Sequence, residues 1–176
     1  QQILVIERAF RDDLKLDEGA TLTPSRLAQV RWPVFFNDLT DVGCEILASG
    51  RFNVPSLSHL SIESDGAVSD EGLAALASST TLFRRAIQLQ LDLKDVGVRG
   101  VRSVCRPETA FRRVRCLDLN GCQVSATAIR DLGAAQSPFR LIQDLSLQGC
   151  GVGDAELRAI ASSPSGFRRL RRLRLG

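Results

Sequence analysis

The chain has 176 residues, of which 44% are hydrophobic, 24% are charged and 5% are aromatic, and its formal net charge is +3. This is the length of one ordinary domain with enough apolar content to bury a core, and the composition excludes disorder, collagen and a disulfide-dense scaffold. No stretch approaches the roughly 18–20 apolar residues that a membrane-spanning helix needs, so we expect no membrane partner.

Residues 1–30 do not share the regular pattern of the rest of the chain. The apolar run at 3–6 is too short for the core of a signal peptide. The alternation at Leu14-Lys15-Leu16 predicts a strand, and 22–30 predicts a helix. The next strand pattern follows only 18 residues after Leu14, at Trp32. We therefore expect an irregular or short N-terminal repeat over 1–30.

From residue 31 onward the chain repeats itself at steps of 28 or 29 residues, and this is the informative feature of the sequence. A phenylalanine followed by an arginine occurs at Phe83-Arg84, Phe111-Arg112, Phe139-Arg140 and Phe167-Arg168. Apolar columns keep the same step, as at Leu89, Leu117, Leu145 and Leu173, or at Leu73, Val101, Ile129 and Leu157. We expect about five to six repeats over 31–176, the last of them incomplete.

Each repeat combines two periodicities. Leu117 and Leu119 flank a polar residue, which is typical of a strand with one buried face, and the apolar residues at 124, 129 and 132 suit one face of a short helix. Ser125, Asp70 and Asp154 stand where helix N-caps are expected. Strand, turn, helix and return loop then follow one another, which predicts an α/β fold with a parallel sheet. Because helices are wider than strands, the stack should curve with its strands inside.

The pattern Val114-x-x-Leu117-x-Leu119-x-x-Cys122-x-Val124, which recurs from Ile142 to Val152, resembles the leucine-rich repeat. The repeat length and the cysteine at the Asn/Cys position resemble the ribonuclease-inhibitor-like subclass. The resemblance covers about 30–176 and departs at Asp65, Ala86 and Lys94. It implies a curved, horseshoe-shaped solenoid with parallel strands on the concave face and short helices on the convex face. It also implies a non-enzymatic module that binds other macromolecules, usually proteins.

Strand alternation predicts which polar side chains face the concave wall. They are His59, Ser61, Glu63, Gln88, Gln90, Asp92, Cys116, Asp118, Asn120, Asp144, Ser146, Gln148, Arg172 and Arg174. The centre of this wall is acidic and rich in amides, while its C-terminal end is basic. An acidic centre disfavours a phosphate backbone, so we expect a protein partner within a larger assembly, for which the chain is a scaffold or a structural subunit.

Four of the arginines form a column that follows the sequence repeat. Arg84, Arg112, Arg140 and Arg168 recur directly after the phenylalanines, and stacking would align them along the loop edge. One interpretation is a candidate anion-binding edge, which makes an RNA- or ribonucleoprotein-associated subunit the alternative function. The other is a solvated rim whose arginine stems cover the phenylalanines.

Side chains that carry chemistry are few. The five cysteines include no C-x-x-C pair, and His59 is the only histidine, so we expect reduced thiols, no metal site and an intracellular location, in the cytoplasm, an organelle or a cytoskeletal assembly. Cys122 and Cys150 are expected to be buried in the turns after their strands. Ser61 and His59 could be neighbours on one strand, but no further catalytic motif accompanies them. We expect no catalytic residues, no cofactor and no small-molecule substrate.

Overall fold

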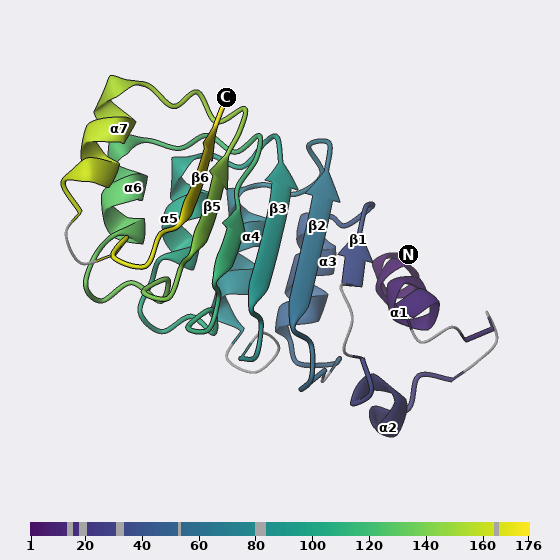
Figure 1. The fold of residues 1–176 in the computed structure, drawn as a ribbon. Coiled ribbons are helices and arrows are strands. Elements are labelled where there is room, and N and C mark those ends of the chain that lie inside the picture. The colour runs from purple at the N-terminus through teal and green to yellow at the C-terminus, as the bar shows by residue number, and fades with distance from the viewer. Residues whose placement is uncertain (14–15, 18–20, 31–33, 53, 80–83, 164–165) are drawn as a thin grey trace.

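The computed structural model describes residues 1–13, 16–17, 21–30, 34–52, 54–79, 84–163 and 166–176. These residues form an α/β fold with a single six-stranded parallel sheet (Figure 1). The strands are β1 (Val34–Phe36), β2 (His59–Ser64), β3 (Gln88–Leu93), β4 (Cys116–Asp118), β5 (Asp144–Leu147) and β6 (Arg172–Leu175). The helices are α1 (Gln2–Asp13), α2 (Pro24–Leu27), α3 (Asp41–Ala48), α4 (Asp70–Ser78), α5 (Val98–Val104), α6 (Ala126–Leu132) and α7 (Asp154–Ala161).

The strands lie in the sheet in the order in which they occur in the chain. Their register follows the sequence repeat, because Leu89 pairs with Leu60 on one side and with Leu117 on the other, and Leu145 pairs with Leu173. Helices α3 to α7 lie along one face of the sheet, and no helix of the described residues lies over the opposite face (Figure 1). The alternation of strands and helices that the repeat predicts is therefore confirmed over β2 to β6.

The core lies between the sheet and helices α3 to α7. The predicted apolar columns are buried there, and among their fully buried members are Leu73, Leu89, Leu91, Val101, Leu117, Ile129 and Leu145. Phe111 and Phe139 are buried and stack with their ring centroids 6.1 Å apart and an interplanar angle of 11°. Phe167 is partly buried, and Phe83 lies outside the described residues. The phenylalanine column is therefore core at 111 and 139.

Helices α2, α3, α4 and α6 begin after a serine or threonine N-cap, whereas α5 and α7 begin after a glycine. Some neighbouring helices are linked at these ends. Ser125 accepts a hydrogen bond from the backbone N–H of Ala128 and is the N-cap of α6, as predicted. The prediction is wrong by one residue at Asp70 and Asp154, which are the first residues of their helices, after Ser69 and Gly153. Asp70 instead reaches the next helix, where its Oδ1 accepts the N–H groups of Gly97 (2.7 Å) and Gly100 (2.9 Å).

The same contact from one helix to the next occurs at α3. Asp41 Oδ1 accepts the N–H of Ser69, and Asp41 Oδ2 accepts its hydroxyl, at 2.8 and 2.7 Å. A Cβ atom at Gly72 or Gly100 would meet the carboxylate of Asp41 or Asp70 at 2.1 and 2.6 Å. The small residue in the second helix therefore makes room for the carboxylate of the first, and the pair fixes how closely adjacent helices pack.

The N-terminal region differs from its prediction. Gln2–Asp13 is a helix with Ile6 and Phe10 buried, and it covers the β1 edge of the sheet (Figure 1). The helix expected over 22–30 is confined to Pro24–Leu27, with Thr23 as its N-cap. For the strand expected at 14–16, Leu14 and Lys15 lie outside the described residues and Leu16 is not in a strand. Ile3, Ile6 and Phe10 have the spacing of one face of a helix, and this spacing could have predicted α1.

The C-terminal elements α7 and β6 are more exposed than their equivalents in earlier repeats. Leu157, Leu173 and Leu175 are 42%, 37% and 40% exposed, although their equivalents in earlier repeats are buried. None of the helices in the described part of the chain has the length and apolar character needed to cross a lipid bilayer.

Candidate functional site

The face of the sheet that carries no helix, here called the open face, presents three rows of side chains. The strand registers place in the first row His59, Gln88, Cys116, Asp144 and Arg172. They place in the second row Phe35, Ser61, Gln90, Asp118, Ser146 and Arg174. The third row begins with the paired Glu63 and Asp92, and Asn120 and Gln148 follow the ends of β4 and β5. All residues predicted for the concave wall therefore lie on one surface.

The open face changes character from one end to the other. At the β1 end the ring of Phe35 is 58% exposed. Glu63, Asp92 and Asp118 make the centre acidic, and burial raises the pKa of the Asp118 carboxyl above its usual value. At the β6 end Arg172 and Arg174 are exposed and basic. Phe35 was not predicted for this face, although Val34-Phe35-Phe36 has a large apolar residue at the position that the next repeat gives to Ser61.

The expectation that every residue of this set is exposed is wrong for two serines. Ser61 is 8% exposed and Ser146 is 3% exposed. Both have longer side chains beside them on the two neighbouring strands, Phe35 and Gln90 for Ser61 and Asp118 and Arg174 for Ser146. Asn120 is half-buried and structural: its Oδ1 accepts the Ser146 hydroxyl at 2.8 Å and the N–H of Gln148 at 3.1 Å. Ser61, Ser146 and Asn120 therefore shape the surface of the open face but offer few hydrogen-bonding groups to a partner.

A charged cluster joins the last three strands across the open face. Arg172 donates from Nε to Asp144 Oδ1 at 2.5 Å and from Nη2 to Asp144 Oδ2 at 3.0 Å. The Cys116 thiol donates to Asp144 Oδ2 at 3.3 Å. The hydrogen bonds from Arg172 hold the pKa of the Asp144 carboxyl below its usual value, while burial and the Asp144 contact raise the pKa of the Cys116 thiol. Arg174 borders the same shallow hollow of about 210 Å³ and forms no ion pair with any described residue.

The remaining cysteines are structural. Cys150 donates to the carbonyl of Leu119, directly after β4, at 2.9 Å, and Cys122 lies 3.9 Å from that of Leu91 on β3. Burial raises the pKa of Cys122 to about 12 and that of Cys150 to about 11, so neither is a thiolate at neutral pH. Gly149 and Gly151, with φ of 69° and 66°, shape the turn that brings Cys150 inside.

The turns at Asp65 and Lys94, where the repeat pattern departs from its cysteine, are built differently. Strands β2 and β3 run on to Ser64 and Leu93, both of which are buried. Lys94 is left exposed, and its Nζ contacts Asp65 Oδ1 at 2.6 Å. The two departures from the pattern therefore pair with each other across adjacent turns.

The hydroxyl that His59 contacts is that of Ser58, whereas the sequence placed Ser61 beside it. The Nδ1 of His59 lies 2.8 Å from the hydroxyl of Ser58, and Ser61 is buried. Within the described ranges no three His, Cys, Asp or Glu side chains come together as metal ligands.

A second surface, here called the loop edge, follows the return loops between each helix and the next strand. Arg84, Arg112, Arg140 and Arg168 are all exposed on it, as the repeat predicts. A hollow of about 600 Å³ brings together Arg84, Arg85, Arg112 and Arg113, with Glu108 as its acidic lining residue. Arg112 donates to the backbone carbonyl of Pro107 at 2.8 Å.

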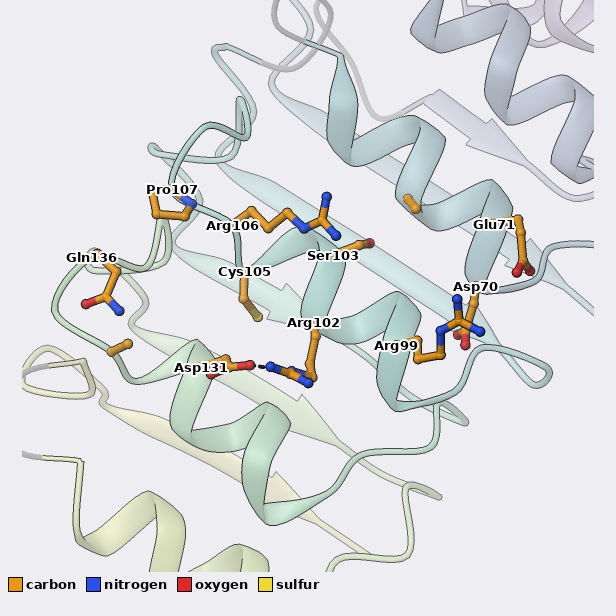
Figure 2. A pocket seen from close by; sticks show the side chains of 12 residues that line it. Asp70, Glu71, Arg99, Arg102, Ser103, Cys105, Arg106, Pro107, Asp131 and Gln136 are labelled. Atoms are coloured by element: carbon orange, nitrogen blue, oxygen red, sulfur yellow. Dashed lines mark hydrogen bonds and ion pairs between the residues drawn. The ribbon is translucent and has the colours of Figure 1, made fainter.

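A third hollow, of about 510 Å³, lies on the helix side of the molecule, over α4, α5 and α6 (Figure 2). Its lining mixes both signs of charge, because Arg99, Arg102 and Arg106 stand among Asp70, Glu71 and Asp131. Arg102 Nε contacts Asp131 at 2.6 Å, and the contact joins α5 to α6. The Asp70 carboxylate is already held by α5. This hollow therefore belongs to the packing of the helices.

No protein-family model matches this chain, and no curated protein matches its sequence.

Proposed function

We propose that the chain is a leucine-rich-repeat solenoid that acts as a non-enzymatic protein–protein interaction module, either a scaffold or a structural subunit of a larger assembly. The partner binds the open face, which is the concave wall of the proposed horseshoe. The observation that carries the proposal is the open face itself: a helix-free surface on which the strand register aligns polar side chains from five consecutive strands. The fold does not need most of these side chains, since the core lies on the other side of the sheet.

The open face offers the parts that protein interfaces use. Phe35 is a large aromatic ring exposed among polar residues, and such rings are the common anchors of interfaces. The acidic centre at Glu63 and Asp92 favours basic groups of the partner, and Arg174 favours a carboxylate. We therefore propose a partner that places an apolar group near Phe35, basic groups at the centre and an acidic group at the β6 end.

The buried, hydrogen-bonded thiols support a place for this module inside the cell. Cys122 and Cys150 donate to backbone carbonyls and do not pair with each other. Reduced thiols are usual in such a compartment.

The test combines site-specific crosslinking with a charge reversal. A photoreactive side chain at Gln90, in the middle of the open face, should crosslink one protein in a native extract, and the same group at Arg130, on α6, should not. Reversal at Glu63→Lys together with Asp92→Lys should abolish that crosslink, because the acidic centre would then repel the basic groups of the partner. The fold should be preserved, since neither carboxylate has a hydrogen bond or ion pair with any described residue.

The matched control is Asp12→Lys together with Glu45→Lys, which changes the net charge equally on the exposed sides of α1 and α3. Equal crosslinking from Gln90 and Arg130, or a crosslink that survives the reversal at 63 and 92, would contradict the proposal.

A further inference from the structure

The charge of this chain is divided between its surfaces. The four return loops at 79–87, 105–115, 133–143 and 162–171 contain ten arginines and one acidic residue, Glu108, and so carry +9. The other residues, with 13 basic and 19 acidic side chains, carry −6. The small positive net charge of the chain therefore hides a strongly basic edge on an otherwise acidic molecule.

The return loops form one continuous surface. Backbone hydrogen bonds of the sheet extend into them, because Arg115 N–H donates to the carbonyl of Ile87, Gln143 N–H to that of Arg115, and Arg171 N–H to that of Gln143, each at 2.7 Å. Successive loops therefore run side by side at about the strand spacing of 4.8 Å. The loops follow the lower edge of the sheet in Figure 1, where the strands begin.

Three arginines of this edge are available to a ligand. Phe111 and Phe139 directly precede Arg112 and Arg140 in the sequence. Their rings are buried and stacked on each other, and they fix the backbone of these two loops to the core. Arg84, Arg85 and Arg113 are exposed and form no ion pair with any residue in the described ranges. Arginines elsewhere do pair, as Arg102 does with Asp131 and Arg172 with Asp144.

We propose that the loop edge binds the phosphate backbone of a nucleic acid, with Arg84, Arg85 and Arg113 around the hollow at the centre of the contact. A ladder of guanidinium groups at a regular step fits a polymer of regularly spaced anions. The phenylalanines are buried and cannot stack on bases, so binding is independent of sequence. Protein interfaces are usually anchored by large aromatic or apolar side chains. On the described parts of these loops the one large hydrophobic side chain of the exposed class is Ile87, at 41% exposure, and no aromatic ring is exposed.

The test measures binding of a fluorescent single-stranded RNA of about 20 nucleotides and mixed sequence to the chain by anisotropy, at salt concentrations from about 50 to 200 mM. The edge variant is Arg84→Gln, Arg85→Gln and Arg113→Gln. Arg112 is left in place because of its contact with Pro107. The control variant is Arg8→Gln, Arg99→Gln and Arg130→Gln, three exposed arginines on helices with the same change in net charge.

The edge variant should bind at least about tenfold more weakly, and the slope of log K against log salt should fall by about 2, since each phosphate contact contributes about 0.7. The control variant should stay within about threefold of the wild type, and bound RNA should protect Arg84, Arg85 and Arg113 from arginine-specific modification read by mass spectrometry. Four results would overturn the proposal: no binding at the lowest salt, an unchanged edge variant with no protection, equal losses in both variants, or a polyglutamate peptide that binds more tightly than the RNA.

Discussion

The two ends of the sheet are built differently. At the β1 end, α1 packs over the edge strand, and Ile6, Phe10 and Phe36 are almost completely buried. At the β6 end, Leu173 and Leu175 of the edge strand are more than a third exposed. The same columns of leucine are thus core in one place and surface in another. In a stack of repeats a side chain is buried by the repeats on both sides of it. Its position within the repeat therefore does not by itself determine how much it contributes to the free energy of unfolding.

Helix α1 takes the place of a neighbouring repeat at the β1 end. The ring of Phe10 lies 5.9 Å from that of Phe36 and 5.5 Å from that of Phe52. Gln2 accepts the N–H of Thr40 through its side-chain oxygen and donates to the carbonyl of Asp38. The Gln2 side chain of α1 thus accepts the N–H of the N-cap residue of α3, just as the Asp41 carboxylate accepts the N–H of the N-cap residue of α4.

The largest expected effect tests this closure. Phe10→Ala should lower the free energy of unfolding by about 3–5 kcal/mol, because it removes a buried aromatic ring from the contact between α1 and β1. Leu4→Ala, on the same helix but 63% exposed, is the control and should change it by less than about 0.5 kcal/mol. Urea unfolding followed by circular dichroism measures both, and equal effects would mean that α1 does not close the sheet.

A matched pair within one column compares the middle of the stack with its β6 end. Leu73 on α4 and Leu157 on α7 occupy the same position in the repeat, but Leu73 is fully buried and Leu157 is 42% exposed. Leu73→Ala should destabilise the chain by about 2–5 kcal/mol and Leu157→Ala by less than about 1 kcal/mol. Similar losses at the two sites in urea titrations would show that something covers α7 in solution.

The period of the sequence was enough to predict the strands from β2 onward, the helices from α3 onward and the residues of the open face, because local alternation fixes which side of a strand faces the core. It was not enough where contacts between repeats decide. The burial of Ser146 depends on its neighbours across the sheet. Asp70 has the sequence context of an N-cap, but its carboxylate accepts the N–H of Gly97 at the start of the next helix. Helix α1 falls outside the 28-residue period, and Phe35 was missed because its repeat lacks the polar residue that marks the open face.

The contact of Asp70 with the next helix provides a smaller comparison. Asp70→Ala leaves the N–H groups of Gly97 and Gly100 without their acceptor, which should cost about 1–3 kcal/mol. Asp154, at the same repeat position on α7, has its side chain in solvent and makes only a 3.8 Å contact with Arg158. Asp154→Ala should therefore change the stability by less than about 0.5 kcal/mol.

Hydrogen exchange makes the effect of Asp70→Ala specific. The amides of Gly97 and Gly100 should exchange faster in that variant, because they lose a hydrogen bond that no other described group supplies. This increase should exceed the one that the lower global stability causes at other amides. Unchanged protection at both glycines would mean that the carboxylate is not the group that holds α5 to α4.

The smallest expected effect reports on the last strand from inside the open face. Cys116 is the one partly exposed cysteine, and its thiol contacts Asp144, which is in turn held by Arg172 of β6. Burial comes first and Asp144 second in raising the pKa of this thiol, and Arg172 opposes them. Asp144→Asn removes a negative charge and should lower the pKa of Cys116, so alkylation at about pH 8 should become about two- to threefold faster. Arg172→Gln should shift the pKa of Cys116 in the opposite direction and slow the reaction, with Cys116→Ser as the blank. If both variants change the rate in the same direction, β6 is not held in its place beside β5 by this charged contact.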